Sequence, residues 1–397
     1  MMDLMSLAQD AAITDAAWLH NLSPFALRLS GSMGLRWYGL SYACGFLIAW
    51  LLMRWLAKRN ATPLTAQECT DALLALVMGV VVGGRLGYVL FYDPSLLTSF
   101  TKSAPWWGVV RLNEGGMASH GGMVGVVIAC WWIARSASAR LSSMQPSGET
   151  SQAGAWPQRV PTLHVMDLTA FVATPGLLLG RLANFVNGEL LGKIVSPPGT
   201  PAPWWAVRFP QERLEWFGRE GPAGVARGHA PALSPDQEVV LDALLARVRL
   251  PTDTDYGAYV RLLNELHHGG ASVSRGIAAD LAPLIAARHP SQLYQAFAEG
   301  IVLTVVLWMI WKRPRTPGMI ASAFLVVYGV LRVVTEFWRL PDSHLSVERI
   351  AGLSRGQWLS VVMVLAGIAL AVGAKVWSRN HRYPAMGGWG DVAHGAK

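Results

Sequence analysis

The chain has 397 residues, of which 52% are hydrophobic and 15% charged, and its formal net charge is +8. Soluble domains average about 25% charged residues, so this composition indicates a membrane protein. Basic residues stand mostly in short clusters between apolar runs, and no RNA-binding or zinc-finger pattern accompanies them, so we expect no nucleic-acid partner. The three cysteines have neither metal-ligand nor CxxC spacing, and no metal site is expected.

Apolar runs near twenty residues long predict about seven membrane-spanning helices. In chain order these runs cover residues 38–56, 72–92, 115–134, 166–186, 292–311, 318–338 and 358–376. The predicted fold class is therefore an all-α polytopic membrane protein.

Short basic segments predict the orientation of these helices. Clusters such as Arg54, Lys58 and Arg59 follow the first, third, fifth and seventh runs, whereas the opposite segments carry fewer basic residues. The clusters should face the cytoplasm, which places the N-terminus outside and the C-terminus inside. The expected division is an outer N-terminal segment 1–37, helices one to four in 38–192, an outer head 193–289, helices five to seven in 290–377 and a cytoplasmic tail 378–397.

Two segments interrupt the helices. Residues 136–161 are rich in Ser, Gln, Pro and Gly, which predicts a mobile cytoplasmic loop. Residues 193–289 should form a small extracytoplasmic head. Its stretch PAPWWAVRFP alternates enough to suggest a strand, and residues 241–250 and 259–267 could be short amphipathic helices.

Charged side chains inside a spanning helix are costly and are therefore functional candidates. Arg85, Arg181 and Arg332 each lie about fourteen residues along an outward-running span, roughly 10 Å below the outer face. His120 lies about five residues into an inward-running span, at roughly 8 Å. We expect these four residues to line one polar cavity in the outer leaflet.

Three arginines in one cavity would repel one another unless negatively charged groups lie beside them. Glu336, four residues after Arg332, can neutralise it on the same helical face, and Glu189 could serve Arg181 or Arg85. The remaining positive charge favours a phosphate, which a guanidinium binds through its bidentate fork. At that depth the abundant anion is a phospholipid headgroup. Glycines flank these residues, and Gly115 with Gly116 could break a helix start.

Each residue also has a purely structural explanation. Arg332 and Glu336 could form a simple ion pair, Arg85 could extend to the interface, and His120 could bind a carbonyl. Asn184 and Asn187 could cap a helix end. The shared depth favours the functional interpretation, because independent structural residues need not lie in one layer.

The motif GRLANFVNGELLG, at 180–192, resembles the signature of the prolipoprotein diacylglyceryl transferase family. Further blocks resemble that family in the same order and touch six of the seven spans: RWYGLSY, GGRLGYVLFYDP, EGGMASHGGMVG, RHPSQLYQ and YGVLRVVTEFWR. The resemblance implies a bacterial inner-membrane enzyme with seven helices, a periplasmic N-terminus and a periplasmic head.

The family transfers the diacylglyceryl group of phosphatidylglycerol to the lipobox cysteine of prolipoproteins and releases glycerol 1-phosphate, with no metal or other cofactor. By resemblance, His120, Arg181 and Arg332 would be catalytic, with His120 as base or proton relay and the arginines on the phosphate. By resemblance, substrate binding would use Arg181 again together with Tyr38, Asn184, Glu189, Gly192, Tyr328 and Glu336. To this set we add Arg85, from its depth in the membrane, and Asn187, from its place in the polar motif.

The sequence departs from the family pattern at Ser119, Lys193 and Gln295, where an aromatic residue, arginine and glutamate are usual. The loop 136–161 and the head are also longer than typical. A transporter or a lipid-binding scaffold is the alternative function. The absence of repeat symmetry and the off-centre polar layer argue against a transporter, and a scaffold would not need His120.

Overall fold

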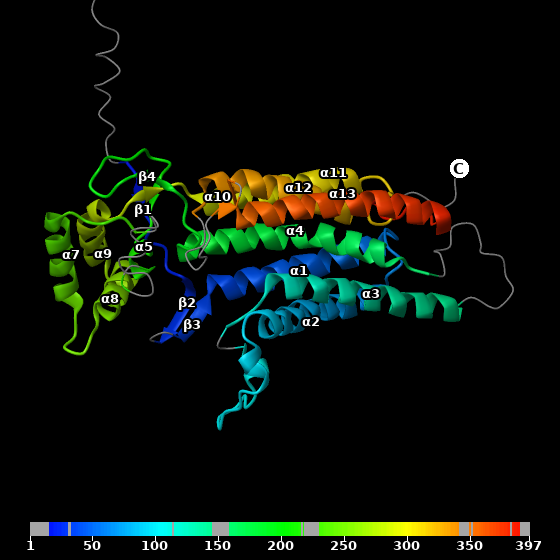
Figure 1. The fold of residues 1–397 in the computed structure, drawn as a ribbon, viewed down its shortest axis with the longest axis horizontal. Helices are drawn as coiled ribbons and strands as arrows, with labels where there is room; N and C mark the ends of the chain where they lie inside the picture. Colours follow the sequence, from blue (N-terminus) through cyan, green and yellow to red (C-terminus); the bar gives the residue numbers. More distant parts are fainter. Residues whose placement is uncertain are drawn as a thin grey trace, which may run out of the picture. The chain divides into compact units, whose positions relative to one another are not determined.

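The computed structural model describes residues 16–30, 33–112, 115–144, 159–215, 217, 230–340, 349–350, 352–381 and 383–389 (Figure 1). This described part contains seven helices long and apolar enough to cross a membrane, which confirms the predicted polytopic fold class. Five of them are single helices: α1 (Trp37–Lys58), α2 (Ala66–Phe91), α3 (Ser119–Met144), α4 (Thr162–Asn187) and α13 (Arg355–His381). The fifth span in chain order is a continuous run of α10 (Ser291–Gln295), η6 (Ala296–Val302) and α11 (Leu303–Trp311). The sixth is a run of α12 (Met319–Thr335) and η7 (Glu336–Trp338).

Several helices extend beyond the predicted apolar runs. The helix α2 begins at Ala66, where Thr65 and Glu68 form a capping box that satisfies backbone N–H groups at the helix start. The helix α3 continues to Met144, so it takes in the first part of the predicted loop 136–161, whereas residues 145–158 lie outside the described residues. A hydropathy window stops at the first polar residues, although a helix can continue beyond the apolar layer.

Close contacts divide the chain into two compact units. The first unit comprises Met1–Ala43, Leu177–Gly300 and Leu331–Val361, and the second comprises Cys44–Gly176, Ile301–Val330 and Val362–Lys397. Each unit is described separately below.

The first unit contains the head predicted at 193–289. Four short strands form one sheet in the order β1 (Trp18–Leu19), β5 (Val207–Arg208), β6 (Ala287–Arg288) and β4 (Ile194–Ser196). Strand β5 lies in the stretch expected to be extended. The helices α7 (Pro235–Val248) and α8 (Asp255–His268) agree with the expected amphipathic pair, and the sequence reading missed α9 (Ala271–Leu281). Figure 1 shows α7, α8 and α9 grouped beside this sheet.

Leucine-rich faces of the three head helices form a core that includes Leu244, Tyr259 and Leu281. A fully buried ion pair ties the short helix α5 (Glu212–Glu215) to β6, because Arg288 Nε lies 2.7 Å from Glu212 Oε2. The other oxygen of Glu212 accepts the Ala286 N–H at 3.0 Å. Both partners of such a pair must remain, since removing one leaves an uncompensated buried charge.

The remaining strands of the first unit are two small antiparallel pairs. One pair is formed by β2 (Phe25–Ser30) and β3 (Met33–Arg36), which lead directly into α1. The other is formed by β7 (Arg349–Ile350) and β8 (Leu353–Ser354), which precede α13.

Two histidines of the first unit, His20 and His267, are expected to make its stability sensitive to acid. Burial lowers the pKa of His20 to about 4, and burial together with the charge of His20 lowers the pKa of His267 to about 4. The unfolded chain therefore binds more protons, and the free energy of unfolding falls as the pH drops below about 6.5 towards 4. Hydrogen exchange of α8 amides, corrected for intrinsic rates, should show clearly weaker protection at pH 5 than at pH 7. Equal protection would contradict this expectation, and His267→Leu should reduce the difference.

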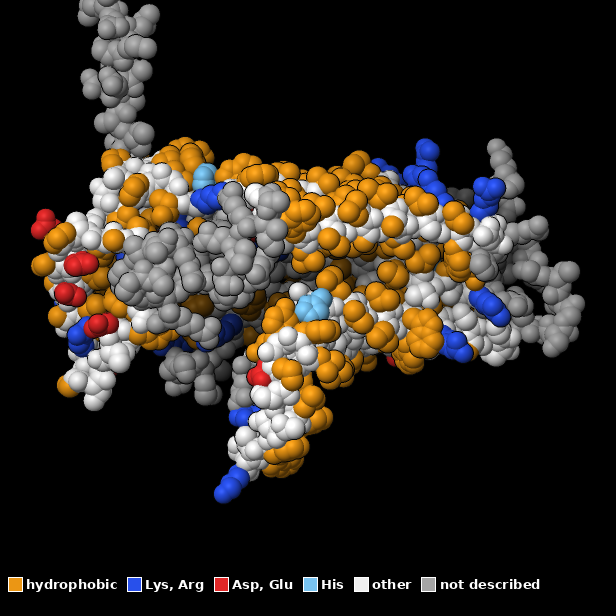
Figure 2. All heavy atoms as spheres, viewed as in Figure 1, with side chains coloured by type: hydrophobic (Ala, Val, Ile, Leu, Met, Phe, Trp, Pro, Cys, Tyr) orange, Lys and Arg blue, Asp and Glu red, His pale blue; other side chains and the backbone are white. Residues whose placement is uncertain are grey.

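Glycines allow α2 and α3 of the second unit to pack closely. A Cβ atom on Gly83 would lie 2.4 Å from the carbonyl oxygen of Gly121, and one on Gly125 would lie 1.9 Å from that of Gly79. Only small residues allow two membrane helices to approach so closely. Figure 1 shows the two helices side by side, and Figure 2 shows the hydrophobic side chains along the spanning helices.

Candidate functional site

An arginine of the signature motif meets an acid that the sequence reading did not single out. Arg181, on α4, donates from Nε and Nη2 to Glu299 Oε2, at 3.1 and 2.9 Å. Glu299 lies on the π-helical segment η6 and is fully buried. Such π-helical turns often occur at functional sites. The signal for Glu299 was present, because the residue falls inside the predicted span 292–311.

The same carboxylate also binds a second helix. Arg332 Nη1 donates to Glu299 Oε1 at 3.4 Å, and the hydroxyl of Thr335 lies 3.3 Å from that oxygen. Arg181 and Arg332, 151 residues apart in the sequence, thus share one buried counterion. The expectation that these two arginines converge is supported by this geometry.

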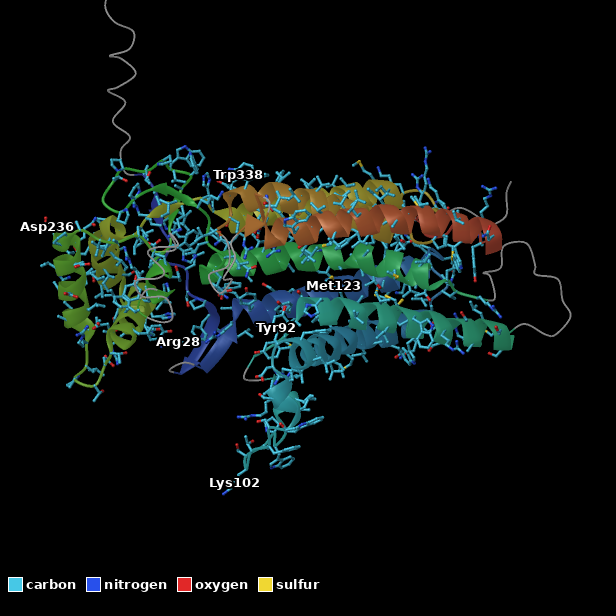
Figure 3. All side chains as sticks on the ribbon, viewed as in Figure 1. Arg28, Tyr92, Lys102, Met123, Asp236 and Trp338 are labelled. Carbon is cyan, nitrogen blue, oxygen red and sulfur yellow. The ribbon has the colours of Figure 1, made fainter. Side chains whose placement is uncertain are left out.

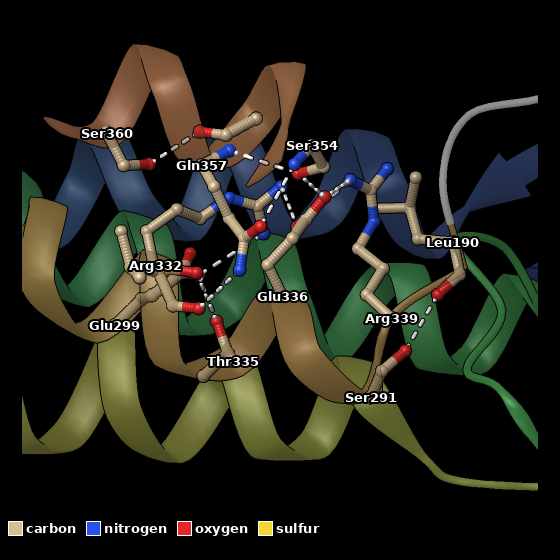
Figure 4. Close-up of polar contacts among 12 residues, drawn as sticks. Leu190, Ser291, Glu299, Arg332, Thr335, Glu336, Arg339, Ser354, Gln357 and Ser360 are labelled. Carbon is tan, nitrogen blue, oxygen red and sulfur yellow. Dashed lines mark hydrogen bonds and ion pairs between the residues drawn. The ribbon is translucent and has the colours of Figure 1, made fainter. Parts of the chain in front are cut away.

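The network extends along α12 and η7 to the start of α13 (Figure 4). Arg332 Nη2 lies 3.3 Å from Glu336 Oε2, in the predicted pairing of residues four apart. Glu336 also accepts from Arg339 and from the Ser354 hydroxyl, each at 3.4 Å. Three guanidiniums and two carboxylates are joined by these ion pairs, so the linked groups carry one positive charge in excess.

The asparagines of the motif orient a tyrosine and a glutamate. Tyr38, near the start of α1, donates its hydroxyl proton to Glu189 Oε2 at 2.8 Å and accepts a hydrogen bond from the Asn184 amide. Asn187 Nδ2 lies 3.5 Å from the other oxygen of Glu189. The backbone carbonyl of Glu189 accepts a hydrogen bond from Gln292. The two asparagines of the motif thus hold the Tyr38 hydroxyl and the Glu189 carboxylate in one hydrogen-bonded group.

Gly192, the last residue of the motif, is required for packing. A Cβ atom at this position would lie 2.0 Å from the carbonyl oxygen of His289. Gly192 also forms an isolated β-bridge with Arg339, and its carbonyl accepts from the buried Arg288 at 3.1 Å. The residue therefore joins the motif to the segment that carries Glu336.

In the second unit, Arg85 is surrounded by backbone carbonyls. Its Nε donates to Val109 at 2.7 Å, and its two Nη atoms donate to Gly108, Arg111, Gly115 and Gly116. These bonds occupy all five N–H donors of the guanidinium. The side chain thereby holds the segment that leads into α3. Substrate binding by Arg85 stays a prediction, and this geometry favours an indirect role, through the placement of His120.

His120 lies in the first turn of α3, where its ring contacts Phe91 and Tyr92 with centroid distances of 5.3 and 5.7 Å. Figure 3 shows Tyr92 at the end of α2, Met123 on the neighbouring α3 and Lys102 at the tip of the loop that connects these two helices. An apolar groove of about 690 Å³ extends from His120 along both helices to Trp131 and Trp132.

Tyr328, on α12, stacks on Phe324 with a centroid distance of 5.6 Å and also belongs to the second unit. The contacts described above place the site residues of the first unit in two groups, Tyr38 with Asn184, Asn187 and Glu189, and Arg181 with Arg332 and Glu336 through Glu299. Gly192 is bridged to Arg339 of the second group. A single cavity that also includes Arg85, His120 and Tyr328 stays a prediction. Among the described residues, no group of three or more His, Cys, Asp or Glu side chains could hold a metal ion.

Comparison with known proteins identifies relatives over nearly the whole chain. A family model described as prolipoprotein diacylglyceryl transferase matches residues 24–373. A phosphatidylglycerol–prolipoprotein diacylglyceryl transferase of Bdellovibrio bacteriovorus is 40% identical over 370 residues, which cover 91% of this chain and 94% of the relative. Proteins of the same name from Burkholderia thailandensis and Ralstonia pickettii are each 34% identical, over 89% and 88% of this chain and 95% and 92% of their own lengths.

Proposed function

The chain belongs to the prolipoprotein diacylglyceryl transferase family, and on this premise we propose how its arginine–glutamate network acts on a lipid. The protein is a transferase that moves the diacylglyceryl group of phosphatidylglycerol to the lipobox cysteine of prolipoproteins, the first step of lipoprotein maturation. We assign this activity to the site around Arg181 because Arg181 and Arg332 both form ion pairs with the buried Glu299. A transporter is not favoured by the relatives.

The two arginines are suited to bind the phosphodiester of the lipid. Their side chains are 19% and 14% exposed, whereas Glu299 is fully buried behind them. The carboxylate fixes both guanidiniums in place, so they need no reorganisation when charge develops on the leaving phosphate. Bidentate N–H donors match phosphate oxygens, and the excess positive charge of the linked groups favours an anion.

The reaction breaks a carbon–oxygen bond and forms a carbon–sulfur bond. The cysteine thiol loses its proton, the sulfur attacks the glycerol carbon, and the bonding electron pair leaves with the phosphate oxygen as glycerol 1-phosphate. A free thiol has a pKa of about 8.5, so a base accelerates attack by raising the fraction of thiolate. His120 is our candidate for this base or for a proton relay. Asn184 would donate a hydrogen bond to the substrate through the amide N–H that Tyr38 does not accept, and Tyr38 would donate one by giving up its bond to Glu189.

The remaining elements of the proposal concern location. The seven apolar helices make this a multi-pass membrane protein, and the relatives are bacterial. We place the protein in the bacterial inner membrane, with the head and the site on the periplasmic side and the C-terminus in the cytoplasm. Phosphatidylglycerol and prolipoprotein lipobox peptides would enter sideways from the bilayer, because both are anchored in lipid.

Transfer can be tested with purified protein, phosphatidylglycerol labelled in its diacylglyceryl group and a lipobox peptide. We expect a labelled thioether peptide and an equal amount of glycerol 1-phosphate, and no labelled peptide when the lipobox cysteine is serine. Release of glycerol 1-phosphate without a thioether product would refute the transferase assignment. Binding of phosphatidylglycerol without turnover would indicate a scaffold instead.

A further inference from the structure

A basic groove lies in the second unit, and none of its lining residues is assigned to transfer. It has a volume of about 900 Å³ and is lined by the later part of α3, by the segment before α4 and by α13. Two arginines, Arg135 and Arg159, stand at its rim. Figure 2 shows several separate Lys and Arg side chains at one end of the spanning helices.

The two arginines lack an acidic partner within the described residues. Arg135 is exposed, and its guanidinium lies 5.6 Å from the centre of the Trp131 ring. Arg159 is also exposed, and no carboxylate lines the described groove around it. A serine joins the two chain segments that carry them, since the Val160 N–H, next to Arg159, donates at 2.8 Å to the hydroxyl of Ser138, which follows Arg135 on α3. Two guanidiniums that line one groove without a carboxylate among the described lining favour an anion in it.

The rest of the lining suits a lipid. The first turn of α4, at Thr162 and Leu163, also lines the groove, and a helix N-terminus adds N–H donors and a favourable dipole for an anion. One wall is the small and apolar face of α13, which includes Leu370 and Gly373. No atom lies within 4 Å of the position of a Cβ on Gly373, so this wall is open. Trp131, which is half exposed, belongs to the residue type typical of the membrane interface.

We propose that this groove is a binding site for an anionic phospholipid, whose phosphate lies between Arg135 and Arg159 and whose acyl chain follows α13 past Leu370. Basic pockets at the ends of membrane helices bind anionic headgroups in this way. A free phosphate would use the arginines but not the apolar wall. The groove shares no residue with the Arg181–Glu299–Arg332 network, so this lipid is not the one consumed in the reaction.

A photoactivatable phosphatidylserine in nanodiscs of phosphatidylcholine tests the proposal, because phosphatidylserine is anionic but is not the proposed substrate. Cross-links mapped by mass spectrometry should concentrate in α13 and the later part of α3. The double variant Arg135→Gln/Arg159→Gln should reduce them about tenfold or more. Both residues are exposed, so the variant should fold, and this is checked by its elution and its transfer activity.

Matched controls separate this site from general surface charge. Arg379→Gln removes an exposed charge from α13, one wall of the groove, at a residue that does not line it, and should leave the cross-links unchanged. Excess inorganic phosphate should not displace the probe. The proposal is overturned if a phosphatidylcholine probe labels the groove equally, if the double variant labels as the wild type does, if Arg379→Gln causes the same loss, or if phosphate alone competes.

Discussion

Arg181→Ala is expected to lower the rate of diacylglyceryl transfer about a thousandfold or more, while the protein still inserts into the membrane. The guanidinium that would stabilise the leaving phosphate is lost, and single donors or arginines of this kind contribute about 10² to 10⁵ in rate. Glu299 keeps Arg332 as a partner, so its charge stays paired. The measurement is transfer of labelled lipid to a lipobox peptide by protein of verified monodispersity.

Two further variants make this test specific. Arg181→Lys keeps the charge but loses the fork, and its activity should lie between those of wild type and Arg181→Ala. Arg247→Ala removes an arginine of an exposed head ion pair, with side-chain exposure of 63%, and should leave transfer unchanged. Near-normal activity of Arg181→Ala would mean that the phosphate role belongs to another residue.

Glu299→Leu is expected to be more damaging than the loss of either arginine, because it removes the shared counterion of both. Arg181 and Arg332 would be left partly buried without this carboxylate, and breaking a buried pair costs about 3–5 kcal/mol. Both the thermal midpoint in detergent and the transfer rate should fall. Glu299→Gln keeps the side-chain shape, so it should retain more stability than Glu299→Leu while still losing most activity.

A matched control for this prediction is Asp280→Asn, which neutralises an acid in an exposed ion pair of the head. It should change neither the thermal midpoint nor the transfer rate. If Glu299→Leu were as stable and active as this control, Glu299 would not be the group that holds the two arginines.

Features that depend on residues close together in the sequence could be predicted from it. Apolar runs identified the seven spans, and spacing by four residues identified the ion pair of Arg332 and Glu336. Depth along the helices indicated that Arg181 and Arg332 would converge. Glu299 could have been found by the same rule, since it is an acid within an apolar span, but its π-helical turn and its two partners depend on tertiary packing.

Other features could not be read from the sequence because they depend on backbone atoms far apart in the chain. Arg85 resembled a cavity arginine by depth, yet its donors meet carbonyls of residues 108–116, a loop whose path no periodicity reveals. The ring contacts of His120 likewise depend on that path. By contrast, the expectation that Gly115 and Gly116 break a helix start agrees with their φ values of +81° and +80°, and α3 begins at Ser119, four residues after the start of the apolar run.

Gly192 changes how mutational data on the signature motif should be interpreted. Since even one methyl group there would collide with the backbone at His289, any substitution must displace the chain between the motif and Arg339. An inactive Gly192 variant would therefore report a displaced scaffold rather than a lost chemical group. Steric exclusion alone accounts for the glycine at this position, and only its neighbours with functional side chains can be assigned chemical roles by replacement.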